Sequence, residues 1–224
     1  MVPHDDRPAD DESARVGRGE VRMNERTFPA TQAQRLEDPE RLVWLPPADV
    51  LSALKIQSGM TVADIGAGTG YFSLPLAAAL GSSGRVYAVD AQDEMLRWIA
   101  TKIEKNSATG RAALAEIVLV HADATATTLP EASCDLYWCA NVWHELGNRA
   151  EALAEARRVL KPGGRLAILD WRPDVERIAG PPLDHRISTG EVKQEIENSG
   201  FLDVSIGCVG LYSWLVQADS SASN

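Results

Sequence analysis

The chain has 224 residues, of which 45% are hydrophobic, and a formal net charge of −10 at pH 7. This length suits one domain with short additions, and the acidic balance disfavours nucleic-acid partners, because the average surface repels a phosphate backbone. No apolar run approaches the roughly 20 residues of a membrane span, and the N-terminus lacks the apolar core of a signal peptide, so we expect no membrane partner and a cytoplasmic location.

The two ends of the chain differ in composition from the rest. Residues 1–28 are rich in Asp, Arg, Pro and Gly and nearly lack large apolar side chains, so we predict a disordered tail. Residues 218–224 have the same character and the same prediction. The stretch between them, residues 29–217, contains no internal repeat and no second linker, and we predict that it forms one domain.

The domain is predicted to open with two short helices within residues 29–57, in EDPERLVWL and PPADVLSAL, each with a proline near its first turn, and we expect these helices to cover the site as a lid. Strand and helix signals then alternate. Five strands are expected at residues 61–66 and in GRVYAVD, AEIVLVHAD, CDLYWCAN and RLAILDW. The helices among them follow from apolar residues at helical spacing: Phe72, Leu76 and Leu80; Met95, Ile99 and Ile103; Leu153, Ala156 and Leu160.

Two of the expected helices begin with side-chain caps. Asn148 precedes Glu151 by three residues, and Ser188 precedes Glu191 by the same interval. Beyond the second of these helices, FLDVSIGCVG and LYSWLVQA are expected to form a closing hairpin. The whole pattern predicts an α/β fold: a doubly wound, seven-stranded, mostly parallel sheet with helices on both faces and an antiparallel C-terminal hairpin.

Polar residues mark the ends of the expected parallel strands. In a sheet of this kind, ligands bind at the carboxyl ends of the strands, where the strand order reverses. The residues in question are Asp64, Asp90, Asp123, Asn141 and Asp170. We therefore expect a binding site along this edge.

The first strand runs into VADIGAGTGYFS, a glycine-rich turn before a helix. This order binds nucleotide-like ligands, and Asp90 follows at the distance expected of a ribose ligand. A dinucleotide fold would need a third glycine where this chain has Tyr71, which disfavours NAD. Asp64 would repel a pyrophosphate and suits an ammonium or sulfonium instead. A hydride donor and a methyl donor remain the alternatives, and these residues favour the methyl donor.

Four blocks in order, VADIGAGTG, VYAVDAQDEML, HADATATTLP and RRVLKPGGRLAILDW, resemble the motifs of class I S-adenosylmethionine-dependent methyltransferases. The resemblance spans roughly residues 38–217 and is strongest to small bacterial enzymes of the ubiquinone/menaquinone-biosynthesis type. It implies a Rossmann-like fold, S-adenosyl-L-methionine as cofactor and methyl transfer to a small-molecule acceptor. The alternatives are a non-catalytic module that binds this cofactor or its demethylated product and, less favoured, a protein methyltransferase.

The resemblance also implies roles for individual residues. Asp64 would face the methionine ammonium, Asp90 both ribose hydroxyls, and Asp123 the adenine amino group. Asn141 would lie beneath the methionine part of the cofactor. Further cofactor contacts would come from the glycine turn and from residues after the second and third strands: Gly66, Ala67, Gly68, Gly70, Tyr71, Ala91, Met95 and Ala124.

The acceptor side of the site is less defined by the sequence. A general base assists methyl transfer if the acceptor is a hydroxyl, phenol or enol. His144, after the fourth strand, and His185, in the loop after the fifth, are the catalytic candidates, with a surface or capping role as the alternative for each. Trp143 and Trp171 follow strand ends, and we expect them to wall a substrate pocket together with Arg186, with ordinary packing as the alternative.

The cysteines give little support for other chemistry. Cys134, Cys139 and Cys208 are an odd number without a CxxC pair, which argues against a disulfide framework and against a metal site. Arsenite methyltransferases use three thiols, but buried cysteines more commonly serve as small apolar residues. We expect no metal.

Overall fold

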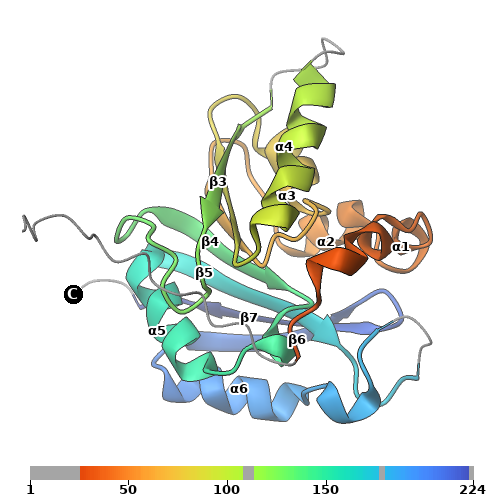
Figure 1. The fold of residues 1–224 in the computed structure, drawn as a ribbon. Coiled ribbons are helices and arrows are strands. Elements are labelled where there is room, and N and C mark those ends of the chain that lie inside the picture. Colours follow the sequence, from red (N-terminus) through yellow and green to blue (C-terminus); the bar gives the residue numbers. More distant parts are fainter. Residues whose placement is uncertain (1–25, 108–113, 177–179, 222–224) are drawn as a thin grey trace, which may run out of the picture.

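The structure, a computed structural model, describes residues 26–107, 114–176 and 180–221. Most of the predicted N-terminal tail and residues 222–224 therefore lie outside the described part. The centre is a seven-stranded sheet in the order β3-β2-β1-β4-β5-β7-β6, with helices on both faces (Figure 1). The strands are β1 (Thr61–Ile65), β2 (Arg85–Asp90), β3 (Glu116–His121), β4 (Cys134–Ala140), β5 (Leu160–Trp171), β6 (Leu202–Val209) and β7 (Ser213–Asp219).

The α-helices α2 to α6 divide between the two faces of the sheet (Figure 1). One face carries α2 (Pro47–Ala53), α3 (Ser73–Leu80) and α4 (Asp93–Ser107), and the other carries α5 (Arg149–Val159) and α6 (Thr189–Asn198). Short elements complete the fold: the 3-10 helices η1 (Ala30–Glu37), η2 (Trp143–Glu145) and η3 (Leu183–His185), and the one-turn helix α1 (Arg41–Trp44). None of the helices in the described ranges is long and apolar enough to cross a membrane.

Strand β4 shows why both faces need cover. Successive side chains of a strand point to opposite faces. Leu136 and Trp138 pack with α2 and α3, whereas Tyr137 and Cys139 pack with α5 and α6, and all four are fully buried. A strand apolar on both sides must lie inside a sheet that is covered twice.

The strand pairing confirms the predicted architecture. β1 pairs in parallel with β2 and β4, β2 pairs in parallel with β3, and β4 with β5. The antiparallel part is the C-terminal hairpin, in which β7 pairs with both β5 and β6. Both predicted caps are present: the Glu151 amide donates to Asn148 Oδ1 and the Glu191 amide donates to Ser188 Oγ, each at 3.2 Å.

Three boundaries differ from the predicted ones. The helix expected in EDPERLVWL is only α1, because the residue before Pro39 is held extended and separates α1 from η1. β5 begins at Leu160 and so includes KPGG, with a register shift against β4. β7 continues to Asp219, past the boundary predicted at residue 218, because Ala218 is buried in the core and Asp219 pairs with Arg165.

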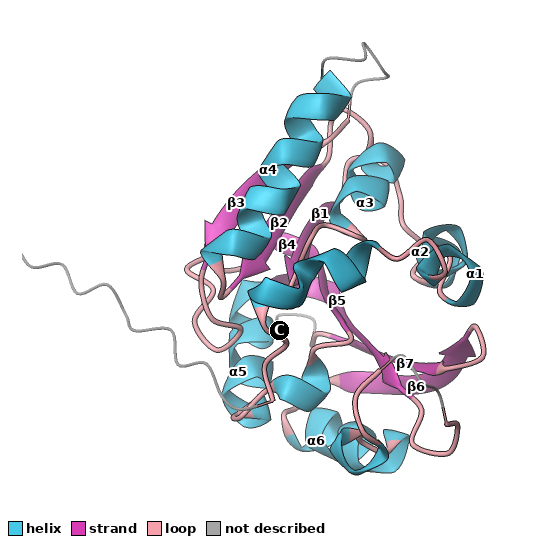
Figure 2. Cartoon of the chain, turned by 45° about the vertical axis from the view of Figure 1, so that its right-hand side comes forward, coloured by secondary structure: helices cyan, strands magenta, loops and turns pink. Residues whose placement is uncertain are grey.

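The N-terminal elements lie beside the first half of the sheet. Figure 2 shows α1 and α2 next to α3, while η1 contacts α4. Tyr71, just after the glycine turn, donates its hydroxyl hydrogen to the Leu45 carbonyl at 2.7 Å, and Lys102 of α4 pairs with Glu37 at 2.7 Å. These contacts hold the segment from η1 to α2 against the carboxyl ends of the strands.

Candidate functional site

A cavity of about 1250 Å³ opens at the carboxyl ends of the parallel strands. Its floor comes from the turn after β1 and from the ends of β2, β4 and β5, and its cover comes from residues 26–44. Most of the residues predicted for the site line this cavity: Asp64, Gly66, Ala67, Gly68, Tyr71, Asp90, Ala91, Met95, Asp123, Ala124, Asn141, His144, Trp171 and His185. Gly70, Trp143 and Arg186 do not.

The glycine turn has a shape that side chains would disturb. Gly66 has φ +65°, and a Cβ at this position would lie 2.4 Å from Val142 Cγ2. Gly70 has φ +83°, and its Cβ would lie 3.0 Å from Ile99 Cγ1 on α4 and from Leu74 Cδ1 on α3. Gly66 therefore allows the turn after β1 to approach the segment after β4, and Gly70 allows α3 to begin close to α4.

Two acidic side chains lie beside this turn, Asp64 in β1 and Asp90 at the end of β2. Asp64 is 3% exposed, and Ser73 donates its hydroxyl hydrogen to Asp64 Oδ2 at 2.6 Å. Burial and, to a smaller extent, the nearby Asp90 raise the pKa of Asp64 to about 7, against the lowering effect of the hydrogen bond from Ser73. A cation beside Asp64 would favour its ionised form and oppose the effect of burial.

Asp90 ends β2 and accepts two backbone hydrogen bonds. The Gly68 amide donates to its Oδ2 at 2.8 Å, and the Gln92 amide donates to its Oδ1 at 2.9 Å. Burial raises the pKa of Asp90 despite these two bonds. The carboxylate thus joins the glycine turn to the residues after β2 and can accept further hydrogen bonds from hydroxyls, since each carboxylate oxygen has two lone pairs.

The loop after β3 closes one end of the cavity. Asp123 Oδ1 accepts from the Thr125 amide at 2.8 Å and from the Thr125 hydroxyl at 2.7 Å, which holds the loop in a tight turn. His121 Nε2 lies 2.9 Å from the Ala91 carbonyl oxygen and so connects the ends of β3 and β2. Apolar surface from Met95, Ala122 and Ala124 lies at this end of the cavity, where a flat ring can be enclosed.

Asn141, which follows β4, has an unusual conformation and an unused acceptor. Its φ is +57°, in the left-handed region that Asn tolerates better than most residues. The Asn141 amide donates to the Leu169 carbonyl at 2.7 Å, whereas its side-chain Oδ1 is buried and has no hydrogen-bond partner among the described residues. A buried acceptor without a partner is costly, so a ligand that donates a hydrogen bond here is favoured.

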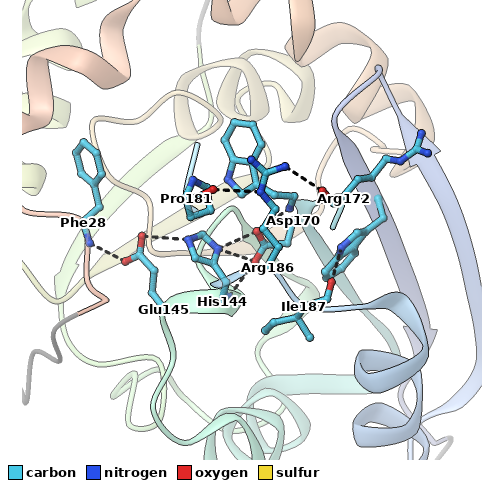
Figure 3. Close-up of polar contacts among 10 residues, drawn as sticks. Phe28, His144, Glu145, Asp170, Arg172, Pro181, Arg186 and Ile187 are labelled. Atoms are coloured by element: carbon cyan, nitrogen blue, oxygen red, sulfur yellow. Dashed lines mark hydrogen bonds and ion pairs between the residues drawn. The ribbon is translucent and has the colours of Figure 1, made fainter. Parts of the chain in front are cut away.

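His144 lines the cavity and pairs with the buried Asp170, which does not itself line the cavity (Figure 3). His144 is 5% exposed, and its Nδ1 lies 2.8 Å from Asp170 Oδ1 at the end of β5. Because an ionised carboxylate only accepts hydrogen bonds, Nδ1 carries the proton and Nε2 keeps its lone pair in the neutral ring. Nε2 lies 3.7 Å from Glu145 Oε1, on the side away from Asp170 (Figure 3).

The charges around His144 oppose the effect of its burial. Burial lowers the pKa of His144, but Asp170 and Glu145 together outweigh burial, so the pKa lies above its usual value. Burial also raises the pKa of Glu145 to about 7, although the Phe28 amide donates to this carboxyl at 2.9 Å and lowers it in part. The arrangement can take up and release a proton inside a water-poor cavity.

The remaining substrate-side candidates lie in different surroundings. Trp171 lines the cavity and contacts Trp44, with the ring centroids 5.2 Å apart. Trp143 is fully buried, and its indole N–H donates to Glu195 of α6 at 3.3 Å, because η2 turns this ring into the core. Arg186 lies behind the cavity and donates to main-chain carbonyls, among them that of Arg172 at 3.0 Å (Figure 3). It therefore holds the loop after β5 instead of facing the cavity.

Sequence reasoning placed the cover of the site in the helices of residues 29–57 and missed the contribution of residues 26–28, which it assigned to the disordered tail. The Phe28 carbonyl accepts from Gln92 Nε2 at 2.8 Å, and the Ala30 amide donates to Gln92 Oε1 at 2.9 Å. Together with the bond from the Phe28 amide to Glu145, these contacts tie the segment Phe28–Ala30 to the residues after β2 and β4. No local signal marks such pairs, since the partners are far apart in the chain.

The three cysteines lie away from the cavity. Cys134 and Cys139 are buried in β4, and Cys208 is exposed in β6. Burial raises the pKa of the Cys134 thiol to about 11 and that of Cys139 well above its usual value, so both thiols stay protonated and unreactive.

Known proteins resemble the chain in sequence and in structure. The methyltransferase domain family matches residues 63–168. A ubiquinone/menaquinone biosynthesis C-methyltransferase from Marinomonas sp. is 30% identical over 130 residues, which are 58% of this chain and 50% of that protein. The chain spans about half the length of the curated relatives it matches.

Solved structures agree with this result. A SAM dependent methyltransferase from Aquifex aeolicus is 33% identical, with a TM-score of 0.79, over 87% of this chain and 100% of that chain. A phosphoethanolamine N-methyltransferase from Haemonchus contortus in complex with S-adenosyl-L-methionine shares the fold at 12% identity, with a TM-score of 0.66, over 88% of this chain and 58% of that one. The chain therefore belongs to the class I S-adenosylmethionine-dependent methyltransferases, and S-adenosyl-L-methionine is its cofactor.

Proposed function

We propose that this methyltransferase acts on a small organic molecule whose accepting atom gives up a proton: the oxygen of a phenol or enol, or the activated ring carbon of such a compound. The observation that carries the proposal is that His144, which lines the cavity, is paired with the buried Asp170. The relatives named as ubiquinone/menaquinone C-methyltransferases support it, because methylation of an aromatic ring carbon also releases a proton. The cavity volume of about 1250 Å³ leaves room for a small acceptor beside the cofactor.

The cofactor would lie between the glycine turn and the ends of β2 to β4. Asp90 would accept hydrogen bonds from both ribose hydroxyls, and Asp64 would face the methionine ammonium. Asp123 and the Ala124 amide would hold the adenine, which the apolar surface of Ala91 and Met95 would flank. When bound, S-adenosylmethionine supplies a methyl group on a sulfonium, which is already activated for transfer.

Three features of the site support this placement. Burial raises the pKa of both Asp64 and Asp90, so cationic and hydrogen-donating groups beside them would stabilise their ionised forms. The buried Oδ1 of Asn141 would accept one hydrogen bond from the methionine part. Among the described residues, the ammonium that contacts the glycine turn is that of Lys102, which is already paired with Glu37.

His144 would act as the general base. Its Nδ1–H is held by Asp170, so the lone pair of Nε2 is available to the acceptor proton. The carboxylates of Asp170 and Glu145 would stabilise the imidazolium that forms. This is the same electrostatic arrangement that keeps the histidine of other base–carboxylate pairs in one tautomer.

The other walls suit a flat acceptor. Trp44, Tyr71, Phe72 and Trp171 line the cavity and offer aromatic surface. Aromatic side chains bind planar rings through stacked or edge-on contacts. His185 lies on the same wall as Pro181 and Pro182, where it would contact the acceptor and not the cofactor.

The test is methyl transfer from radiolabelled cofactor to a panel of phenols, enols and quinols, followed by comparison of His144→Gln with His185→Gln. We expect His144→Gln to lower kcat by about 100-fold or more, the range of general-base catalysis, with cofactor affinity nearly unchanged. His185→Gln should change KM for the acceptor more than kcat. Equal kcat for wild type and His144→Gln would remove His144 from the mechanism. Tight cofactor binding without transfer to any acceptor would favour a binding module.

A further inference from the structure

The cover of the cavity contains a guanidinium that has no carboxylate partner among the described residues. Arg41 of α1 lines the cavity and is largely buried, with its guanidinium carbon 3.9 Å from the centroid of the Tyr71 ring. Its Nη1 donates to the Leu36 carbonyl at 2.9 Å. Within the described ranges no carboxylate forms an ion pair with Arg41, and Glu37, whose charge acts on it, is paired with Lys102.

A buried cation in this situation is destabilised unless something compensates for its lost hydration. Burial lowers the pKa of Arg41, and Tyr71 and Glu37 only partly oppose that effect. The face of the Tyr71 ring contributes a cation–π contact, which satisfies one face of the guanidinium. The remaining N–H donors lie in the plane of the group, where they match the two oxygens of a carboxylate.

The strand ends contribute acids to the cavity, and the cover contributes a guanidinium. Asp64 and Asp90 lie at strand ends, whereas Arg41 lies on α1 in the cover, which also carries the carboxylate of Asp38. A ligand that carries both an ammonium and a carboxylate, or a carboxylate next to a ring, would fit this arrangement. Tyr71, which lies against Arg41, directly follows the glycine turn, so Arg41 also lies near the cofactor side of the cavity.

We propose that Arg41 is a carboxylate-binding residue of this cavity, which extends the proposed function by assigning a ligand group to the N-terminal cover. Two sources can supply the carboxylate: the methionine end of the cofactor or the acceptor. In either case binding would draw α1 towards the strand ends and reduce access of water to the methyl group.

Calorimetry with matched ligands tests this assignment and separates the two sources. S-adenosylhomocysteine and its decarboxylated analogue, which keeps the ammonium, are titrated into wild type and Arg41→Gln. If the cofactor supplies the carboxylate, Arg41→Gln weakens S-adenosylhomocysteine by about 10- to 100-fold and the analogue by less than about twofold. If the acceptor supplies the carboxylate, S-adenosylhomocysteine binds equally to wild type and to Arg41→Gln. With S-adenosylhomocysteine bound, 4-hydroxybenzoate then binds more weakly to the variant than to wild type, whereas 4-hydroxybenzamide binds equally to both.

Two further variants keep the outcome interpretable. Arg41→Lys retains the charge and should recover part of the lost affinity, whereas Arg97→Gln, at an exposed arginine of α4 that pairs with Asp93 away from the cavity, should bind like wild type. The proposal is overturned if Arg41→Gln weakens both members of a ligand pair equally, which would indicate a structural role, or if it weakens neither. A wild type that binds no S-adenosylhomocysteine would instead contradict the proposed function itself.

Discussion

Asp170 holds His144 at two points: its Oδ2 accepts from the His144 backbone amide at 2.9 Å, and its Oδ1 accepts from Nδ1 at 2.8 Å. One carboxylate at the end of β5 thus positions both the main chain of η2 and the imidazole ring. A base that must meet an acceptor proton needs such double support, because small displacements of catalytic groups cost much of their rate.

Removal of the Asp170 charge should change both the rate and its pH dependence. His144 acts as a base only when neutral, and the carboxylates of Asp170 and Glu145 raise its pKa above the usual value despite burial. Of the two carboxylates, Asp170 has the larger effect on the pKa of His144. In Asp170→Asn the pKa of His144 therefore falls, and the acidic limb of the kcat/KM profile moves to lower pH. We expect the plateau to fall by about 10-fold or more, because the imidazolium loses its counter-charge.

The matched control for this experiment is Asp174→Asn, at an exposed acid that pairs with Arg172 outside the cavity. Its profile should coincide with that of wild type. An Asp170→Asn profile that keeps both the wild-type limb and the wild-type plateau would contradict the role of the pair.

Asp64 links stability to pH in a direction that can be measured. Its pKa is about 7 in the folded chain, because of burial, and near 4 in an unfolded one. An acid with a raised folded-state pKa binds its proton more tightly when folded, so its contribution to stability is full below about pH 4 and is lost as pH rises towards and beyond about 7. Asp64→Asn should therefore gain stability relative to wild type between about pH 5 and about pH 8, on the order of 2 kcal/mol.

Urea unfolding of both proteins without ligand at the two pH values measures this difference. The same variant should bind S-adenosylmethionine more weakly and without the rise in affinity that wild type shows as Asp64 ionises. A constant difference in unfolding free energy across the two pH values would show that Asp64 does not titrate in this range.

Gly66→Ala should damage both folding and cofactor binding. The new Cβ would lie 2.4 Å from Val142 Cγ2, at a backbone φ of +65° that side chains rarely adopt. We expect a loss of about 1–3 kcal/mol in unfolding free energy, measured by urea denaturation. Val142→Ala in the same chain should recover only the steric part of the loss. Full stability of Gly66→Ala would contradict the described turn.

The helices and strands of this fold, and the positions where they end, follow from local sequence. Apolar spacing, prolines and capping residues such as Asn148 and Ser188 act within a few residues, and the alternation of elements then sets the parallel sheet. The line of polar strand ends follows from this alternation, which is why most of the predicted site residues line the cavity.

What the sequence does not reveal depends on contacts between distant segments. Trp143 and Asn141 are two residues apart, yet the positive φ of Asn141 and the turn of η2 direct the indole into the core. The pairing of Asp170 with His144 requires the same turn. The bonds between Gln92 and the segment Phe28–Ala30 join residues more than 60 positions apart, which no periodicity records.

The segment Phe28–Ala30 should control how fast the cofactor leaves. Gln92→Ala removes both of its hydrogen bonds to this segment, which lines the cavity through Phe28 and Pro29. We expect S-adenosylhomocysteine to dissociate about 10-fold faster from this variant. Stopped-flow fluorescence of the cavity tryptophans Trp44 and Trp171 measures the rate. Gln194→Ala, at an exposed glutamine of α6 outside the cavity, should release the ligand at the wild-type rate. Equal rates for Gln92→Ala and wild type would contradict this role.

The central claim is that the carboxylate ending β2 holds the ribose of S-adenosylmethionine, and calorimetry tests it most directly. S-adenosylmethionine, S-adenosylhomocysteine and NAD are titrated into wild type and Asp90→Ala, with circular dichroism to establish that the variant is folded. The account predicts micromolar binding of both methionine nucleotides to wild type, a loss of about 100-fold or more in the variant, and no binding of NAD. Equal binding by the folded variant, or NAD binding by wild type in place of the methionine nucleotides, would contradict it.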